Sequence, residues 1–119
     1  MPVKFSNDKP IFLQLADIIK GDILSGKLKT NEKLPSVRDY ALTYSINPNT
    51  VQKALQILED DGLIITNRTN GKFVAENFNK INKEKSKMIT QEINSFFEKM
   101  KNLGYTIQEI KKLISDIGE

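Results

Sequence analysis

The 119-residue chain contains neither cysteine nor histidine. The missing cysteines exclude disulfides and thiol nucleophiles, and both absences together exclude zinc-finger ligands and histidine acid–base catalysis. Three neighbouring carboxylates, Glu59, Asp60 and Asp61, stand at the end of a predicted helix, without the other groups that an acid–base or metal site needs. We therefore expect no enzyme activity and no metal or other cofactor.

Long apolar runs are also missing. No stretch approaches the roughly 20 apolar residues of a membrane span, and the N-terminal Met-Pro-Val-Lys-Phe-Ser lacks a signal-peptide core. The sequence thus predicts a cytoplasmic protein without a membrane partner. With 39% hydrophobic and 28% charged residues, its composition suits one compact domain with a small appendage.

A strong excess of positive charge is missing as well, since the net charge is only +3. Residues 1–78 carry ten Lys/Arg against nine Asp/Glu, and residues 79–119 carry eight against six. A protein that coats nucleic acid without selectivity is usually far more basic. A site-selective binder needs fewer cations, because backbone N–H groups at helix N-termini also hold phosphates.

A helix-turn-helix is predicted between residues 34 and 58. Ser36 suits the start of the first helix, residues 45–47 interrupt the pattern, and Asn47 followed by Pro48 suits the start of the second. The second helix has one apolar face, formed by Val51, Ala54, Leu55 and Leu58. Its polar tip suits insertion into the major groove of DNA.

A β-hairpin, or wing, is predicted directly after the second helix. The segments 63–66 and 72–75 are β-prone, and they enclose a turn-forming segment at residues 67–71. Such a hairpin can touch the DNA backbone or minor groove. Ahead of the helix-turn-helix, the apolar spacing predicts a first helix over residues 10–25, after a loose arm at residues 1–9.

In this order, the motifs resemble the N-terminal domain of bacterial transcription regulators of the GntR family. The family pattern LPS-x-R appears at residues 34–38, N-x-x-TV-x-x-A-x-x-x-LE-x-x-G at residues 47–62, and the wing pattern G-x-G-x-F-V at residues 69–74. The wing departs from the pattern at Thr69, which replaces a glycine, and at Lys72, which replaces a frequent threonine. The resemblance implies a winged helix-turn-helix domain over residues 1–77.

The residues expected to contact double-stranded DNA are polar or basic side chains of the helix-turn-helix and the wing, with a proline and a glycine. They are Ser36, Arg38, Asn47, Pro48, Asn49, Thr50, Gln52, Lys53, Arg68, Thr69, Asn70, Gly71 and Lys72. Plainer roles stay open for several of them. Arg38 can form a surface ion pair, Asn47 a helix cap and Lys53 a solvated surface group, and Gly71 can serve the backbone conformation of the turn.

Residues 78–119 are predicted to form two amphipathic helices. Their apolar residues are Met88, Ile89, Ile93, Phe96, Phe97, Met100, Leu103, Ile107, Ile110, Leu113, Ile114 and Ile117. Two helices cannot bury both apolar stripes by themselves, so we expect a homodimer through this segment. The pattern is similar to the YtrA-type subfamily, in which a short helical C-terminal part dimerises.

The fold class expected is therefore mainly α with a small β-hairpin, and the function is that of a sequence-specific regulator. We expect a repressor that binds a palindromic operator as a homodimer. The alternative is a helical protein-interaction module whose winged domain does not read DNA. Whether a small-molecule effector acts is open; one would be expected between domains or at the dimer interface, with residues 77–82 as the hinge.

Overall fold

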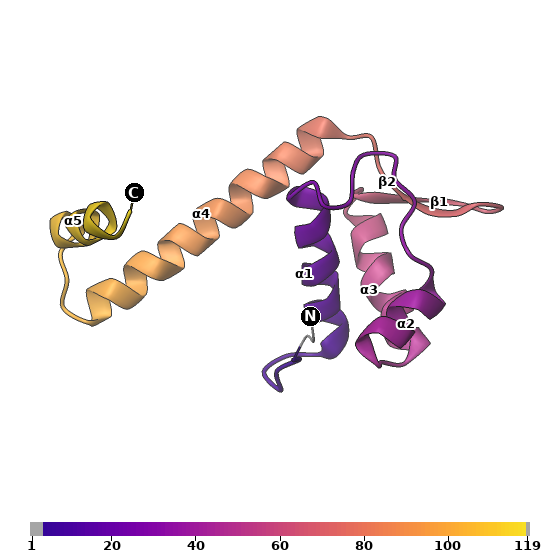
Figure 1. Cartoon of the computed structure of the whole chain (residues 1–119), viewed down its shortest axis with the longest axis horizontal. Helices are drawn as coiled ribbons and strands as arrows, with labels where there is room; N and C mark the ends of the chain where they lie inside the picture. Colours follow the sequence, from indigo (N-terminus) through magenta and orange to yellow (C-terminus); the bar gives the residue numbers. More distant parts are fainter. Residues whose placement is uncertain (1–3, 119) are drawn as a thin grey trace. The chain divides into compact units, whose positions relative to one another are not determined.

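The computed structural model describes residues 4–118 and is mainly helical with one antiparallel hairpin, as predicted (Figure 1). Its elements are α1 (Ile11–Leu24), α2 (Val37–Tyr44), α3 (Pro48–Asp60), β1 (Ile64–Asn67), β2 (Gly71–Val74), α4 (Phe78–Asn102) and α5 (Ile107–Ile117). The chain divides into two compact units, an N-terminal unit ending at Asn82 and a C-terminal unit beginning at Lys83. No helix within residues 4–118 is long and apolar enough to cross a bilayer.

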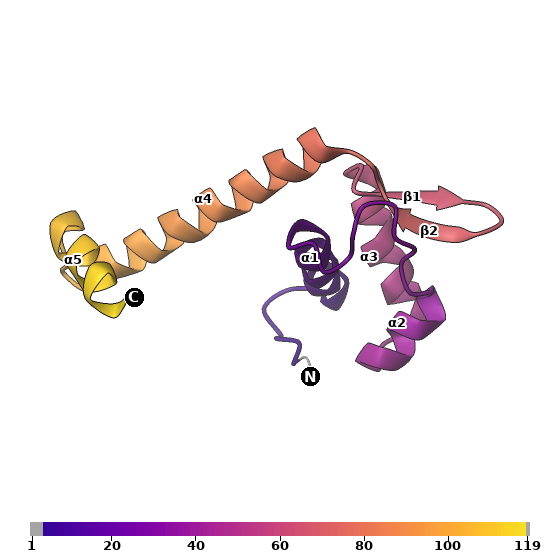
Figure 2. The same ribbon diagram turned by 45° about the horizontal axis from the view of Figure 1, so that its top comes forward.

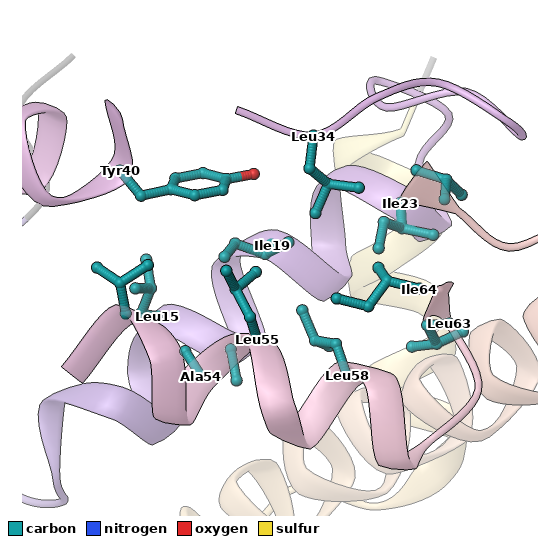
Figure 3. Close-up of a cluster of buried hydrophobic side chains, with 13 residues drawn as sticks. Leu15, Ile19, Ile23, Leu34, Tyr40, Ala54, Leu55, Leu58, Leu63 and Ile64 are labelled. Carbon is teal, nitrogen blue, oxygen red and sulfur yellow. The ribbon is translucent and has the colours of Figure 1, made fainter. Parts of the chain in front are cut away.

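Three helices and the hairpin make up the N-terminal unit. Helix α1 lies beside α3, α2 packs against α3, and the hairpin projects from the C-terminal end of α3 (Figures 1 and 2). The core is a cluster of buried side chains from all three helices, the hairpin and the segment before α2 (Figure 3). Leu15, Ile19, Val51, Leu55 and Leu58 are among its most buried members. The face predicted for the second helix is therefore confirmed as core.

One polar group is enclosed in this core. The ring of Tyr40 points inward from α2 (Figure 3), and its buried hydroxyl has no hydrogen-bond partner among residues 4–118. Burial raises the pKa of the Tyr40 hydroxyl, and the nearby carboxylates of Asp22 and Glu32 and the Tyr44 hydroxyl raise it further. The side chain thus stays neutral and acts as an aromatic core residue.

The local signals that begin α2 and α3 act as expected. The Ser36 hydroxyl accepts a hydrogen bond from the Asp39 N–H at 3.0 Å, and the Asp39 carboxylate accepts one from the Ser36 N–H at 3.3 Å. This reciprocal capping box satisfies two N–H groups at the start of α2. The Asn47 side chain caps α3 by accepting from the Asn49 N–H at 2.8 Å, and Pro48 occupies the first helical position.

The hairpin is present as predicted, but each of its four strand ends lies one residue from the predicted position. Ile64 pairs with Val74 and Asn67 with Gly71. A further segment, which the sequence did not reveal, pairs with the free edge of β2. Residues 31–34 run antiparallel to it, with hydrogen bonds from the Leu34 N–H to the Lys72 carbonyl and from the Val74 N–H to the Glu32 carbonyl, both 2.9 Å. The wing is thereby held on both sides of β2.

The N-terminal arm is ordered where the structure describes it, which corrects the expected loose arm. Residues 1–3 lie outside the described part of the chain. The Gln14 amide of α1 donates to the Ser6 carbonyl at 2.9 Å and to the Lys9 carbonyl at 2.7 Å, and its oxygen accepts from the Ser6 N–H at 2.9 Å. Phe5 packs on the core cluster. One amide side chain thus folds residues 6–9 onto α1.

The C-terminal unit contains most of α4 and all of α5. The polar segment 77–82, predicted as a hinge, lies almost wholly within α4, which begins at Phe78 and ends at Asn102, and the boundary between the two units falls at its end, after Asn82. A capping box begins α5, with the Thr106 hydroxyl accepting from the Glu109 N–H at 3.2 Å. The bonds of the Thr106 N–H and hydroxyl to this carboxylate lower the pKa of Glu109.

The two apolar stripes of this unit are largely exposed. Helix α4 has no buried residue, and α5 has one, Ile110. Ile110 is fully buried within the single chain, so its side chain is not available to a partner in this arrangement. The large apolar side chains left exposed are Ile89, Ile93, Phe96, Leu103, Ile107, Leu113, Ile114 and Ile117, while Met88, Phe97 and Met100 are partly exposed.

Candidate nucleic-acid interface

The tip of α3 presents a polar surface to solvent. Pro48, Asn49 and Gln52 are exposed, and Thr50 is half-buried. The opposite face of the helix is anchored in the core, with Val51 and Leu55 essentially inaccessible. A rigid helix with amide and hydroxyl groups at its exposed end has the donors and acceptors that read base edges.

The backbone at the start of α3 is not free to bind a phosphate. The Asn49 N–H is taken by the Asn47 side chain, while the N–H groups of Thr50 and Val51 bond to the Asn47 carbonyl. Pro48 has no N–H to offer. Contacts from this tip must therefore come from side chains. The Asn47 side-chain oxygen is used for capping, which leaves only its amide nitrogen for a ligand.

Lys53 lies on the side of α3 that faces α1. Its ammonium stands 5.7 Å from the centre of the Phe12 ring, within the range of a cation–π contact. Lys53 is nevertheless exposed. The structure therefore gives this lysine an intramolecular contact in addition to its predicted DNA contact.

Arg38 projects from the first turn of α2 and is exposed. Its guanidinium has no ion pair or hydrogen bond within the described residues, and the carboxylate of the adjacent Asp39 is engaged in the capping box. The surface ion pair left open for Arg38, with Asp39 or Asp61 as the acidic candidates, is therefore not formed within the described residues. The five donors of the guanidinium remain available to a phosphate or a guanine.

The tip of the wing is organised by one side chain. The Asn67 side-chain oxygen accepts hydrogen bonds from the Thr69 N–H at 3.0 Å, the Thr69 hydroxyl at 2.8 Å and the Asn70 N–H at 3.3 Å. Gly71 ends the turn with φ of +104°, a conformation that L side chains rarely adopt. Arg68 is left exposed, with no bonded partner among residues 4–118.

Lys72 is bound within the protein. Its ammonium donates to the Thr66 hydroxyl at 2.7 Å and lies 3.8 Å from a carboxylate oxygen of Glu59. The Thr66 hydroxyl in turn donates to the Glu59 carboxylate. This network, the Glu59–Thr66–Lys72 network, joins the last turns of α3 to both strands of the wing.

A groove of about 440 Å³ separates the start of α2 from the wing. One wall is formed by Leu34, Pro35, Ser36 and Val37, and the other by the wing residues 66–72. Lys33, which was not among the residues predicted to contact DNA, also lines the groove. The signal was available, since Lys33 immediately precedes the LPS motif, but its pairing with β2 could not be seen in the sequence.

The predicted DNA-contacting residues are thus placed on two neighbouring features of the N-terminal unit, the helix-turn-helix and the wing. Ser36 and Asn47 serve mainly as caps, and Lys72 is internally paired. No group of three or more Asp or Glu residues within the described chain could hold a metal ion.

Comparison with known proteins gives a consistent set of relatives. The model of the gntR family of bacterial regulatory proteins matches residues 12–74. The uncharacterised HTH-type regulator YhcF of Bacillus subtilis is 35% identical over 119 residues, covering all of this chain and 98% of that protein. The transcriptional repressor YtrA of the same species is 34% identical over 110 residues, which are 92% of this chain and 85% of YtrA.

Solved structures agree with these relatives. A GntR-family transcriptional regulator from Listeria monocytogenes superposes with a TM-score of 0.87 at 30% identity, over 96% of this chain and all of that one. A DNA-bound neighbour is the DNA-binding domain of AraR with its operator ORE1. It aligns with a TM-score of 0.56 at 26% identity, over 62% of this chain and 90% of that one.

Proposed function

The chain belongs to the GntR family of bacterial regulatory proteins, and from that premise we propose that it represses transcription by binding a palindromic operator as a homodimer. It is a transcriptional regulator and not an enzyme, as its relatives are named. In the proposed complex the tip of α3 enters the major groove, and the wing lies along the phosphate backbone. A bacterial regulator of this kind works on DNA in the cytoplasm, and we place the chain there.

The observation that supports DNA reading most strongly is the polar, exposed tip of α3 on a helix whose other face is fully buried. Asn49 and Gln52 carry amides that can pair with adenine in the major groove. A winged domain that served only to bind another protein would be expected to carry apolar groups at this position. The AraR domain, a structural neighbour, is found on its operator.

The homodimer is supported by the exposed apolar side chains of α4 and α5. Leu103 is 72% exposed and Ile117 is 85% exposed in the single chain. Several large apolar side chains left exposed on the same two helices indicate an interaction site. A second copy is the proposed partner, because two-fold dimers are the commonest oligomers and would present two α3 helices to a symmetric operator.

Repression is proposed by analogy with YtrA, which is named as a repressor and aligns with most of this chain. The same likeness supports placement in the YtrA-type subfamily. The C-terminal unit adds only α5 and most of α4, and a helical pair of this size provides a dimer surface in the proposal rather than an enclosed ligand site.

The test is selection of DNA fragments by the full chain, followed by affinity measurements with variants of α3. We expect enrichment of a palindromic site. Gln52→Ala should weaken binding to that site by about 1–3 kcal/mol and relax the preference at one position per half-site. Gln56→Ala is the matched control, because the Gln56 amide is already bonded to Asp60 at 2.8 Å. Selection of no sequence at all would favour the protein-interaction module instead.

A further inference from the structure

Two lysines next to the groove between α2 and the wing occupy different environments. The Lys72 side chain is only 22% exposed, and its ammonium is bonded to Thr66 and close to Glu59. The Lys33 side chain is exposed. No hydrogen bond or ion pair reaches the Lys33 ammonium within the described residues. Only one of these two charges is therefore free to meet a ligand.

The backbone of Lys33 is held firmly. The residues on either side of it bond to β2, through the Glu32 carbonyl and the Leu34 N–H, and Lys33 itself lies opposite Phe73. This pairing fixes the direction in which the side chain leaves the strand. A lysine whose backbone is held by hydrogen bonds loses less conformational entropy when it binds a ligand than a lysine on a mobile loop.

Gly71 provides the space in which the Lys33 side chain lies. A Cβ atom added at Gly71 would come within 3.1 Å of the Lys33 Cε and 3.8 Å of its Nζ. The ammonium therefore lies against the backbone of the wing at the end of its turn. The glycine at this position has two roles, since it also takes a φ of +104°.

The groove next to Lys33 has the character of an anion site. Its other wall is the start of α2, where the capping box occupies the N–H groups of Ser36 and Asp39 and leaves those of the two residues between them without an intrahelical partner. Positive potential at a helix N-terminus attracts phosphate. The unpaired Arg68 lines the wing side. A phosphodiester of the DNA backbone is the ligand whose charge and shape suit this combination.

We propose that Lys33 is the lysine that contacts the DNA backbone beside the wing, and that Lys72 is a positioning residue held by Glu59 and Thr66. This inference rests on the DNA binding proposed above, and it reassigns the contact that the sequence suggested for Lys72. Lys72, Thr66 and Glu59 fix the wing relative to α3. Lys33 supplies the charge that displaces a counterion from the phosphate.

The experiment compares Lys33→Gln with Lys72→Gln in the full chain, using the selected operator and a random duplex of equal length. Lys33→Gln should weaken binding to both duplexes by a similar factor and make the slope of log K against log salt shallower by about one unit. Lys33→Arg, which keeps the charge, should restore the slope. Lys72→Gln should leave the slope unchanged and weaken the operator complex more than the random one.

A double-mutant cycle tests the positioning role. Glu59→Gln and Thr66→Val should each reproduce the loss of operator affinity seen with Lys72→Gln, and combining either with Lys72→Gln should add little, because the three groups form one network. Circular dichroism and thermal unfolding identify any variant that fails to fold. Additive losses would overturn the positioning role of Lys72.

A shallower slope for Lys72→Gln with an unchanged slope for Lys33→Gln would overturn the assignment of Lys33. Unchanged slopes for both would overturn it as well. Failure of the proposed DNA binding itself would be recognised separately, because the unmodified protein would then bind neither duplex in a salt-dependent way.

Discussion

The helices of the N-terminal and C-terminal units have similar capping signals, but their apolar faces are buried to very different extents. Helices α2 and α5 both begin with a reciprocal capping box, Ser36 with Asp39 and Thr106 with Glu109. Yet the N-terminal helices share a core in which several side chains are inaccessible, while α4 buries no residue and α5 only Ile110. Capping and amphipathic spacing thus specify that a helix forms, and they leave open what covers its apolar face.

The difference separates the two tasks proposed for the chain. The N-terminal unit is complete within one chain, so it can hold the tip of α3 and the wing rigidly for a ligand. The C-terminal unit leaves apolar side chains such as Phe96 and Ile114 exposed, and burying them against a second copy would be favourable at about 25 cal/mol per Å² of apolar surface.

The largest effect is expected from breaking the N-terminal core. Leu55 is 1% exposed, so Leu55→Ala should lower the free energy of unfolding by about 2–5 kcal/mol through lost burial and a cavity. Urea unfolding at fixed protein concentration measures this. The matched control is Leu42→Ala on α2, because Leu42 is 69% exposed. Similar losses for both leucines would contradict the burial of Leu55 in the core.

A smaller effect should follow from charging the apolar face of the C-terminal unit. Phe96→Glu should weaken the proposed dimer by about 2–4 kcal/mol, because aromatic side chains near the centre of an interface contribute most of its affinity. Sedimentation should then give the 13.6 kDa chain mass where the unmodified protein gives twice that value.

The control for this change is Gln91→Glu, at an exposed polar position of α4, which should leave the dimer intact. Phe96→Glu should also lower affinity for a palindromic operator while leaving the thermal unfolding of the N-terminal unit unaltered. An unmodified protein that sediments as a monomer at micromolar concentration would exclude the dimer and the palindrome.

The paired capping boxes offer a direct comparison of the two units. Ser36→Ala should destabilise the N-terminal unit by about 1 kcal/mol, measured by urea unfolding.

Thr106→Ala should reduce helicity of α5 in circular dichroism. Because Thr106 lowers the pKa of Glu109, the stabilisation is present above the usual carboxyl pKa and is lost as the pH falls through the lowered one. Thr106→Ala should make the stability of α5 depend less on pH in the acid range. An unaltered dependence on pH would contradict the stabilising role of the Thr106–Glu109 capping box.

The smallest effect at neutral pH is expected for Tyr40→Phe. The hydroxyl has no partner in the core, so its removal should change stability by less than about 1 kcal/mol. Burial raises the pKa of Tyr40, so folding loses stability as the pH rises above the usual tyrosine pKa near 10, where the unfolded chain ionises first. Tyr40→Phe should lessen that alkaline loss, whereas Tyr105→Phe, at an exposed position, should not.

Much of the N-terminal unit could be predicted because its signals are local. Ser36, Asn47 and Pro48 begin their helices where the capping rules place them, and Gly62 ends α3 with φ of +79°. The long-range pairings could not be predicted. The bonding of residues 31–34 to β2 and the anchoring of the N-terminal arm by Gln14 join segments that no periodicity connects.

In the candidate interface, too, some residues could be predicted from the sequence and others could not. The sequence predicted Asn49, Gln52, Arg38 and Arg68 as contact residues, and each of them is exposed. It gave no reason to prefer Lys33 over Lys72. Both are lysines in polar surroundings, and only their partners distinguish them, since Glu59 and Thr66 lie thirteen and six residues from Lys72 along the chain.

The sequence by itself determined where the helices and the hairpin form and which family the motifs indicate, because caps, apolar spacing and turn residues act within a few positions of the chain. The tertiary structure decided which polar groups are engaged and which are free. That outcome depends on where a folded backbone brings distant side chains together, as it does when β2 places Gly71 beneath Lys33 and Lys72 beside Glu59.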